Sequence, residues 1–247
     1  MKPLALSAFA FAVLAPASAL ARTKLATEVI DGSFASKPVP MMAMLAAMAI
    51  VPFAILMLTS FSKIAVVLSI ARSAMGTQQI PPSTVLTGLA VILSVHVMAP
   101  VFEDMWKEGK AGFENAEDME QMLAAGACAA QPLRAFLTRH GSAADRLMFL
   151  DLAKQLRGEE RSSEVNETDL VVVVPAFVIS ELKGAFQIGF LVFLPFLVLD
   201  MVIANLLLAL GMQSLSPTSV SLPFKLLLFV AVDGWSLLSQ GLILGYR

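Results

Sequence analysis

The segment from Leu170 to Met212 consists almost entirely of Val, Leu, Ile, Phe and Ala, yet it contains Glu181, Lys183 and Asp200. On membrane-insertion scales, an ionised side chain at the centre of a spanning helix costs about 2.5 to 3.5 kcal/mol, whereas each Leu, Ile, Phe or Val contributes only about 0.3 to 0.6. These three charges therefore need partners or water. Such a segment is more typical of an assembly subunit, a conduit or a transporter than of a passive anchor.

Composition places the whole chain in the membrane class. Hydrophobic residues make up 57% and charged residues 15% of the chain, and the mean hydropathy is +0.79. A soluble domain has about 25% charged residues, so a soluble enzyme is excluded. The net charge of −2 hides an acidic segment between Glu103 and Asp169. Because no basic patch with aromatic neighbours is present, nucleic-acid binding is not expected.

The first residues have the features of a secretory signal peptide. Lys2 provides a positive start, Leu4 to Ala15 is apolar but too short to span a membrane, and Ala19-Leu20-Ala21 matches a small-x-small cleavage site. We expect cleavage after Ala21, so that the mature chain begins at Arg22. The alternative is an N-terminal anchor that is retained.

Two apolar helices are expected next, over Met41 to Phe61 and from Thr84 to about Phe102. Between them, Lys63 and Arg72 without any acidic residue predict a cytoplasmic connector. The acidic segment Glu103–Asp169, called the acidic insert below, then lies on the exported side. Its apolar residues recur at helical spacing between Gln131 and Leu156. We expect a small helical subdomain there.

The long apolar segment exceeds the length of one span, so it predicts either two abutting spans or a bent hairpin. Its expected weak points are Gly184, Gly189 and Pro195. A loop at Gln213–Ser221 precedes a last helix, Leu222–Leu244, with Lys225 near its start and Asp233 at its middle. The predicted fold is all-α, of the integral membrane type, with bent hydrophobic helical hairpins and a small helical periplasmic subdomain.

The predicted organisation has five parts: a signal peptide (1–21), a periplasmic N-terminal segment (22–40), two hydrophobic helices (41–102), an acidic helical periplasmic insert (103–169) and C-terminal hydrophobic helices (170–247).

Motifs for catalysis or for metal binding are weak in this sequence. Ser60–Lys63 and Ser180–Lys183 both match a Ser-x-x-Lys pattern, but the companion elements of the acylases that use it are missing. His96 and His140 are isolated, and there is no Walker A loop or His-Glu-x-x-His helix. We therefore expect no enzymatic activity, no cofactor and no metal.

Several motifs occur in order along the chain: Leu58–Ile64, Gly76 with Pro81-Pro82, Met98–Val101, Gln131–Arg134, Pro175–Phe177, Ser180–Lys183, Ala185–Phe190, Asp200, Pro223–Leu226 and Asp233–Trp235. Together they resemble the FliP/SctR family, the main pore subunit of the type III secretion export apparatus of bacterial flagella and injectisomes. The resemblance covers nearly everything from Met41 onward. The ending Gly234–Leu242 is closer to the injectisome branch, and the flagellar counterpart is the alternative.

The resemblance implies a pentamer that joins copies of a small two-helix subunit and one larger export-gate subunit. Together they form a closed helical cone in the bacterial inner membrane, largely facing the periplasm, which conducts unfolded secreted proteins. The hydrophobic helices need not all span lipid in such an assembly. We therefore predict that charges of the apolar helices lie at subunit contacts, namely Glu181, Lys183, Asp200, Lys225 and Asp233.

The family closes its pore with a methionine-rich loop, and the matching residues here are Met212, Gln213, Ser214 and Leu215. Thioether side chains seal a pore because they are apolar and flexible. Two polar residues at this constriction predict a looser seal. An ordinary turn between two helices is the alternative interpretation.

Two other classes of function were weighed. An ion-coupled transporter of small molecules would use Asp200 and Asp233 as ion ligands and should show inverted repeats with broken helices, which are not found. An intramembrane enzyme needs a nucleophile, a base and an orienting group at matching depth, and the sequence offers no such set.

Overall fold

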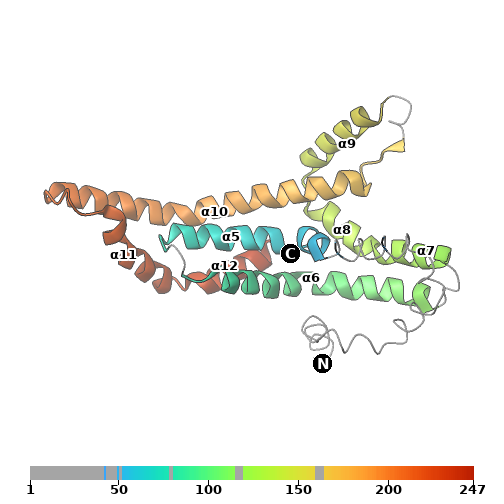
Figure 1. Cartoon of the computed structure of the whole chain (residues 1–247), viewed down its shortest axis with the longest axis horizontal. Coiled ribbons are helices and arrows are strands. Elements are labelled where there is room, and N and C mark those ends of the chain that lie inside the picture. Colours follow the sequence, from blue (N-terminus) through green and yellow to red (C-terminus); the bar gives the residue numbers. More distant parts are fainter. Residues whose placement is uncertain (1–41, 43–48, 50–51, 78–79, 115–118, 159–163) are drawn as a thin grey trace. The chain divides into compact units, whose positions relative to one another are not determined.

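The computed structural model describes residues 42, 49, 52–77, 80–114, 119–158 and 164–247, and within these ranges the chain is helical and contains no strand. An all-α fold is therefore confirmed. The chain divides into two units, Met1–Ala54 and Ile55–Arg247, and the second contains almost all described residues (Figure 1). The predicted signal peptide and the Ala21–Arg22 cleavage site lie outside the described residues, as do residues 41, 43–48, 50 and 51 of the predicted helix Met41–Phe61.

The helices of the second unit follow one another in chain order as α5 (Phe61–Ala74), α6 (Ser83–Glu114), α7 (Met119–Ala129), α8 (Gln131–His140), α9 (Ala143–Arg157), α10 (Leu170–Ala209), α11 (Pro217–Ala231) and α12 (Gly234–Leu244).

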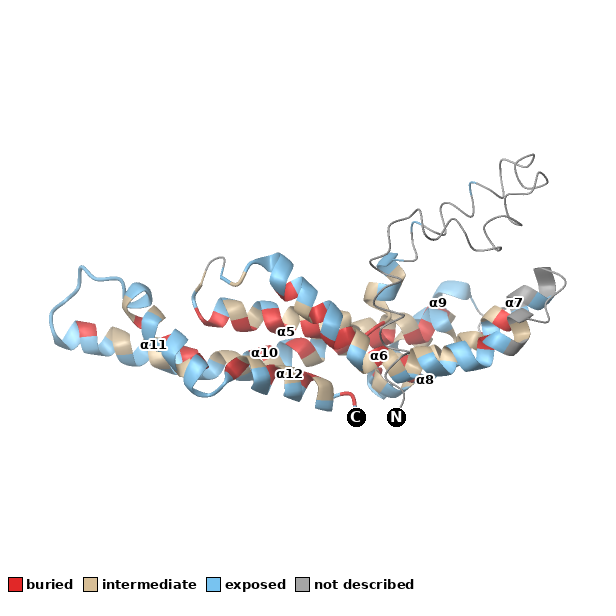
Figure 2. Cartoon of the chain, turned by 90° about the horizontal axis from the view of Figure 1, so that it is seen from below, coloured by how far each residue is buried: buried red, intermediate tan, exposed pale blue. Residues whose placement is uncertain are grey.

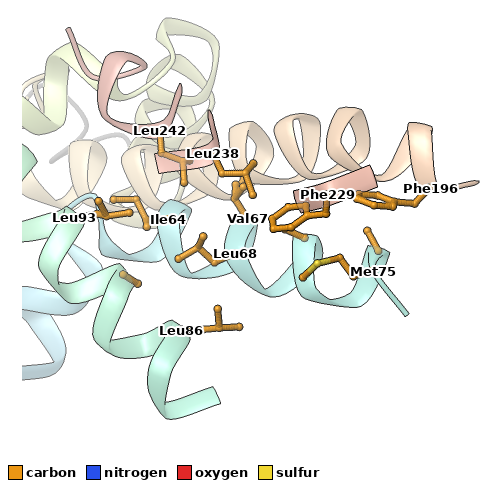
Figure 3. Close-up of a cluster of buried hydrophobic side chains, with 14 residues drawn as sticks. Ile64, Val67, Leu68, Met75, Leu86, Leu93, Phe196, Phe229, Leu238 and Leu242 are labelled. Carbon is orange, nitrogen blue, oxygen red and sulfur yellow. The ribbon is translucent and has the colours of Figure 1, made fainter. Parts of the chain in front are cut away.

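Helix α5 occupies the place where a basic connector was predicted, so a mere connector between two helices is wrong there, while its cytoplasmic side stays a prediction. Its inner face is fully buried at Ile64, Val67 and Leu68, and it packs between α10 and α6. Figure 3 shows these side chains meeting residues of α6, α10, α11 and α12. Lys63 and Arg72 do not mark a loop, because both form hydrogen bonds with residues of other helices. A segment with two basic residues therefore lies at the centre of the largest hydrophobic cluster.

A second core lies where α6, α8 and the start of α10 meet, around Met98, Leu137 and Phe177. Helix α9 adds Ala153 against Val172 of α10. The described part of the segment predicted as a helical insert is thus mostly helical, and its non-helical residues include Gly158 and 165–169. The predicted end of the second helix near Phe102 is wrong, because α6 continues to Glu114. The polar residues after Phe102 end the apolar stretch of α6, but the helix continues through them.

The predicted break inside the long apolar segment is also wrong, because α10 is one helix through Pro175 and Pro195. Its glycines allow close packing rather than bending. A Cβ at Gly189 would lie 2.4 Å from Cδ1 of Ile70, and a Cβ at Gly184 would lie 3.0 Å from Cε of Lys63. Both glycines therefore let α10 approach α5.

The chain reverses directly after α10. Gly211 has a φ of 72°, its N–H donates to the carbonyl of Leu208, and the N–H of Met212 donates to that of Leu207. This is a Schellman motif, which satisfies the last carbonyls of a helix and favours glycine at the left-handed position. The chain therefore turns after the apolar segment and not within it. The predicted loop Gln213–Ser221 is wrong after Ser216, because α11 begins at Pro217.

The predicted single last helix is wrong as well. Helices α11 and α12 meet at 58°, and Asp233 between them has a left-handed backbone with a φ of 51°. Asp tolerates this conformation better than most residues. The break allows Trp235 to pack edge-on against Phe229, with 5.1 Å between ring centroids. Asp233 therefore lies at a corner and not inside a helix.

Two described helices, within Ser83–Lys110 and Leu170–Ala209, are long and apolar enough to cross a membrane, and the bent pair α11–α12 could form a third span. Only 11% of the most hydrophobic window of α10 is buried inside the chain. Figure 2 shows the distal parts of α10 and α11 as mostly exposed. Among the exposed side chains of α10 are Phe186, Phe190, Leu194, Val198, Met201 and Leu206.

Candidate functional site

Glu181 is the centre of the most buried group of charges among the described residues. It is 1% exposed, and its Oε1 accepts a hydrogen bond of 2.7 Å from Nζ of Lys63 on α5. Its Oε2 accepts a hydrogen bond from the hydroxyl of Tyr246. The ammonium of Lys63 also lies 4.5 Å from the centroid of the Tyr246 ring. One carboxylate therefore joins α10, α5 and the residues after α12.

Aromatic rings of α8 cover this group. The Tyr246 ring stacks on Phe136 at 6.0 Å and meets His140 edge-on at 5.1 Å. Burial and the neighbouring Glu181 carboxylate raise the pKa of Tyr246 far above its usual value, so its hydroxyl keeps the proton that it donates. Burial, with Arg139 and Lys63 adding to it, lowers the pKa of His140.

Asp145 forms a second group between α9 and α10. Its Oδ1 accepts a 2.5 Å hydrogen bond from Nζ of Lys183, and its Oδ2 accepts one of 2.8 Å from the Ser180 hydroxyl. These hydrogen bonds hold the pKa of Asp145 below its usual value. Nearby, Nη1 of Arg146 donates to the carbonyls of Thr138 and Gly141, which fixes the corner between α8 and α9.

Asp200 forms the third group, near the hairpin turn. Its Oδ2 accepts a 2.6 Å hydrogen bond from Nζ of Lys225, and its Oδ1 accepts one of 2.6 Å from the hydroxyl of Ser221. Lys225 is only 4% exposed, and its Nζ also donates to the carbonyl of Ala74 at 3.4 Å. This group ties the two helices of the hairpin to the end of α5.

The five predicted contact residues thus have different environments. Glu181, Lys183, Asp200 and Lys225 have partners within the chain. Asp233 is exposed at the α11–α12 corner, and the described part of the chain offers its side chain no hydrogen bond or ion pair. Whether any of the five contacts another subunit stays a prediction.

The predicted constriction residues, Met212 to Leu215, lie together at the hairpin turn, and all four are exposed. Ser216 occupies the N-cap position of α11 without a side-chain capping hydrogen bond, and its hydroxyl lies 3.0 Å from that of Thr218. A short irregular segment with apolar residues at both ends can contact other chains or a passing polypeptide. Its role as a gate stays a prediction.

The two Ser-x-x-Lys sequences have structural partners. Ser60 donates to Ser94 at 3.1 Å while Lys63 binds Glu181, and Ser180 and Lys183 both bind Asp145. Within the described residues, His, Cys, Asp and Glu form no group of three that could hold a metal ion.

The sequence analysis missed Lys63, Tyr246, Asp145 and Ser221 as the partners of the buried charges. Asp145 could have been found from its spacing. It lies four residues before Phe149 and eight before Ala153, so all three share the inner face of α9. Lys63 and Glu181 are far apart in the chain, so no local pattern could connect them.

Comparisons with known proteins match most of this chain. Residues 44–242 match the model of the FliP family. The chain is 44% identical to Yop proteins translocation protein R of Yersinia pestis, over 82% of this chain and 93% of that protein. It is 43% identical to the hypersensitivity response secretion protein HrcR of Ralstonia nicotianae, over 83% of this chain and 95% of the relative. Flagellar biosynthetic protein FliP of Bacillus subtilis is 38% identical over 86% of this chain and 94% of its own length. With its membrane-type helices and a family match over most of its length, the chain belongs to the FliP family.

Proposed function

We propose that this chain is a non-enzymatic subunit of a type III protein export apparatus, and that copies of it enclose a conduit for unfolded proteins. The observation that carries this proposal is the exposed apolar surface of α10. Only 11% of the most hydrophobic 18-residue stretch of this helix is buried inside the chain. Such a surface needs lipid or other subunits to cover it. The names of its relatives in Yersinia and Ralstonia refer to translocation and secretion.

The buried ion pairs support a conduit over an ion-coupled transporter. Both carboxylate oxygens of Asp200 are engaged, by Ser221 and by Lys225, so this residue is not free to bind a transported cation. Internal pairing also leaves the outer face of α10 apolar around Phe186 and Phe190. An apolar outer face suits side-by-side packing of identical subunits.

The proposed assembly is a pentamer in the bacterial inner membrane, together with the small two-helix subunit and the larger export-gate subunit. In this proposal the acidic insert faces the periplasm. We favour an injectisome over a flagellum, since the two secretion relatives quoted above are slightly more similar to this chain than the flagellar one.

Deletion of the gene, followed by complementation, tests this function. Secretion of effector proteins into the medium and swimming motility are measured in parallel. Loss of secretion with normal motility, restored by the intact gene, is expected. Loss of motility with normal secretion would assign the chain to the flagellum, and normal results in both assays would contradict an export function.

A further inference from the structure

The residues after α12 return to the buried centre of this unit. Tyr246 is 9% exposed, and its hydroxyl donates to Glu181. Next to it, Nη2 of Arg139 donates to the carbonyl of Arg247 at 3.2 Å. The end of α12 is therefore held to α8 and α10 by specific contacts. These contacts can be released without breaking the ion pair between Lys63 and Glu181, because Lys63 binds Oε1 of Glu181 whereas Tyr246 binds Oε2.

His140 lies against the ring that must stay in place for this contact. Its imidazole meets the Tyr246 ring edge-on at 5.1 Å and lies 4.6 Å from the ring centroid of Phe136. It is half-buried at the last residue of α8. A change in the charge of His140 therefore acts directly on the Tyr246 ring.

The charged groups around His140 disfavour a further positive charge. Arg139 precedes it on α8, Lys63 acts on it from α5, and both lower its pKa. Glu181 of α10 is the acidic residue of this group, but its two oxygens already accept from Lys63 and Tyr246. An imidazolium at this place would meet cations while the carboxylate is occupied.

We propose that Tyr246 is a latch that stays closed while His140 is neutral and opens when mild acid protonates His140. Opening frees the end of α12 from α8 and α10. Glu181 then keeps Lys63 as its partner, so the helices of the core remain paired. The chemistry of this switch is the binding of one proton, and it does not depend on the proposed export function.

The direction of the pH dependence follows from linkage. Burial and the adjacent cations hold the pKa of His140 below its ordinary value of 6.5 while the latch is closed. The open state binds the proton more readily, so the latch is fully closed above about pH 6.5. As the pH falls from there toward the lowered pKa, the ratio of open to closed latch rises up to about tenfold per pH unit.

Selective labelling makes the latch observable, because the chain contains a single tyrosine. The full-length chain is labelled with ¹³C-tyrosine, purified in detergent and followed by NMR from about pH 8 to pH 5. We expect the Tyr246 signal to move between two positions with a midpoint below pH 6.5, and to stay at the closed position in His140→Gln. His96→Gln is the matched control, since His96 is the other, exposed histidine, and it should titrate like the original chain.

Three results would overturn the latch. The Tyr246 signal could stay constant over the whole pH range, it could titrate unchanged in His140→Gln, or it could lose its titration in His96→Gln. If His140→Gln does not fold, His140→Asn replaces it with the same expected result. Tyr246→Phe gives a second readout, because the pH dependence of the melting temperature below pH 6.5 should become weaker without the hydroxyl.

Discussion

Three buried or partly buried carboxylates of this chain are satisfied in the same way. Glu181 accepts from Lys63 and Tyr246, Asp145 from Lys183 and Ser180, and Asp200 from Lys225 and Ser221, as the hydrogen bonds show. Each carboxylate thus has one ammonium and one hydroxyl as partners. A buried acceptor without a partner costs about 1 to 3 kcal/mol, so complete pairing explains how apolar helices can keep these charges.

Glu181→Gln should strongly destabilise the fold. The change leaves the ammonium of Lys63, whose side chain is 15% exposed, without its charged partner. Breaking a buried pair on one side costs about 3 to 5 kcal/mol, whereas replacing both partners by apolar residues is often nearly neutral. Chemical unfolding of the purified chain in detergent measures the loss.

The double variant Lys63→Met with Glu181→Met serves as the comparison and should recover much of the stability. Lys107→Met is the control at an exposed pair, because Lys107 and Asp104 are 69% and 57% exposed, and it should change nothing measurable. Equal stability of Glu181→Gln and the original chain would show that the buried pair does not matter.

Asp233→Asn should weaken assembly without disturbing the fold. Asn accepts the left-handed backbone of this corner as Asp does, so only the charge is removed. If Asp233 binds a cation of a neighbouring subunit, the charge-assisted bond is worth about 1.5 to 3 kcal/mol. Native gels of the extracted complex measure the yield of oligomer. Normal assembly together with normal secretion would show that the charge is dispensable.

At the scale of helices, hydropathy predicted where apolar segments lie but not where helices bend. The uninterrupted α10 could not be predicted because Gly184 and Gly189 look like weak points until α5 is known to pack on them. Helix α5 was missed because its basic residues suggested a loop, although their partners lie on other helices. Only the dipeptide Asp233-Gly234 gave a local turn signal at the α11–α12 corner.

Of the candidate site, the buried charges were predictable from the sequence, whereas their hydroxyl partners were not. Charges in apolar segments identified Glu181, Asp200 and Lys225, because such residues are expensive without partners. The partner hydroxyls of Tyr246 and Ser221 were not predictable, since a hydroxyl is common and neutral and leaves no mark in a hydropathy profile. Pairing across the fold depends on tertiary contacts that one sequence does not reveal.

The turn between α10 and α11 should control ion leakage if it forms the constriction. Gln213→Met together with Ser214→Met should reduce leakage, because two apolar, flexible side chains per subunit exclude water better than an amide and a hydroxyl. Met212→Ala is the opposite change and should increase it. Leakage of small ions across membranes that contain the complete export gate is measured at equal assembly. Unchanged leakage in both variants would place the barrier elsewhere, most plausibly on a partner subunit.

The segment before the described helices carries a separate prediction. If Ala19-Leu20-Ala21 is a cleavage site, the mature chain begins at Arg22. N-terminal sequencing of the chain from the assembled complex checks this directly. Recovery of Met1 would instead support a retained anchor, and a variant with Ala21→Leu should then behave like the original chain.

In the molecule as a whole, buried charges are paired inside the chain while apolar surface is exposed outside, so this surface needs lipid or other subunits to cover it. The described helices satisfy their buried charges within the chain, while α10 and α11 present Phe190, Leu194 and Leu227 outward. A further apolar pocket between α10, α11 and α12 is open beside Val232 and Leu237. Lipid alone can cover such surfaces, but a conduit requires that other subunits cover at least part of them.

Native mass spectrometry of this chain, purified together with its neighbouring export subunits, tests that requirement most directly. We expect a stable complex with several copies of the chain, five in the proposed pentamer, together with the small and the larger partner subunits. Asp233→Asn provides an internal comparison, since it should lower the fraction of full complexes. A chain that stays monomeric in detergent and in lipid nanodiscs, with its partners present, would contradict the proposed assembly.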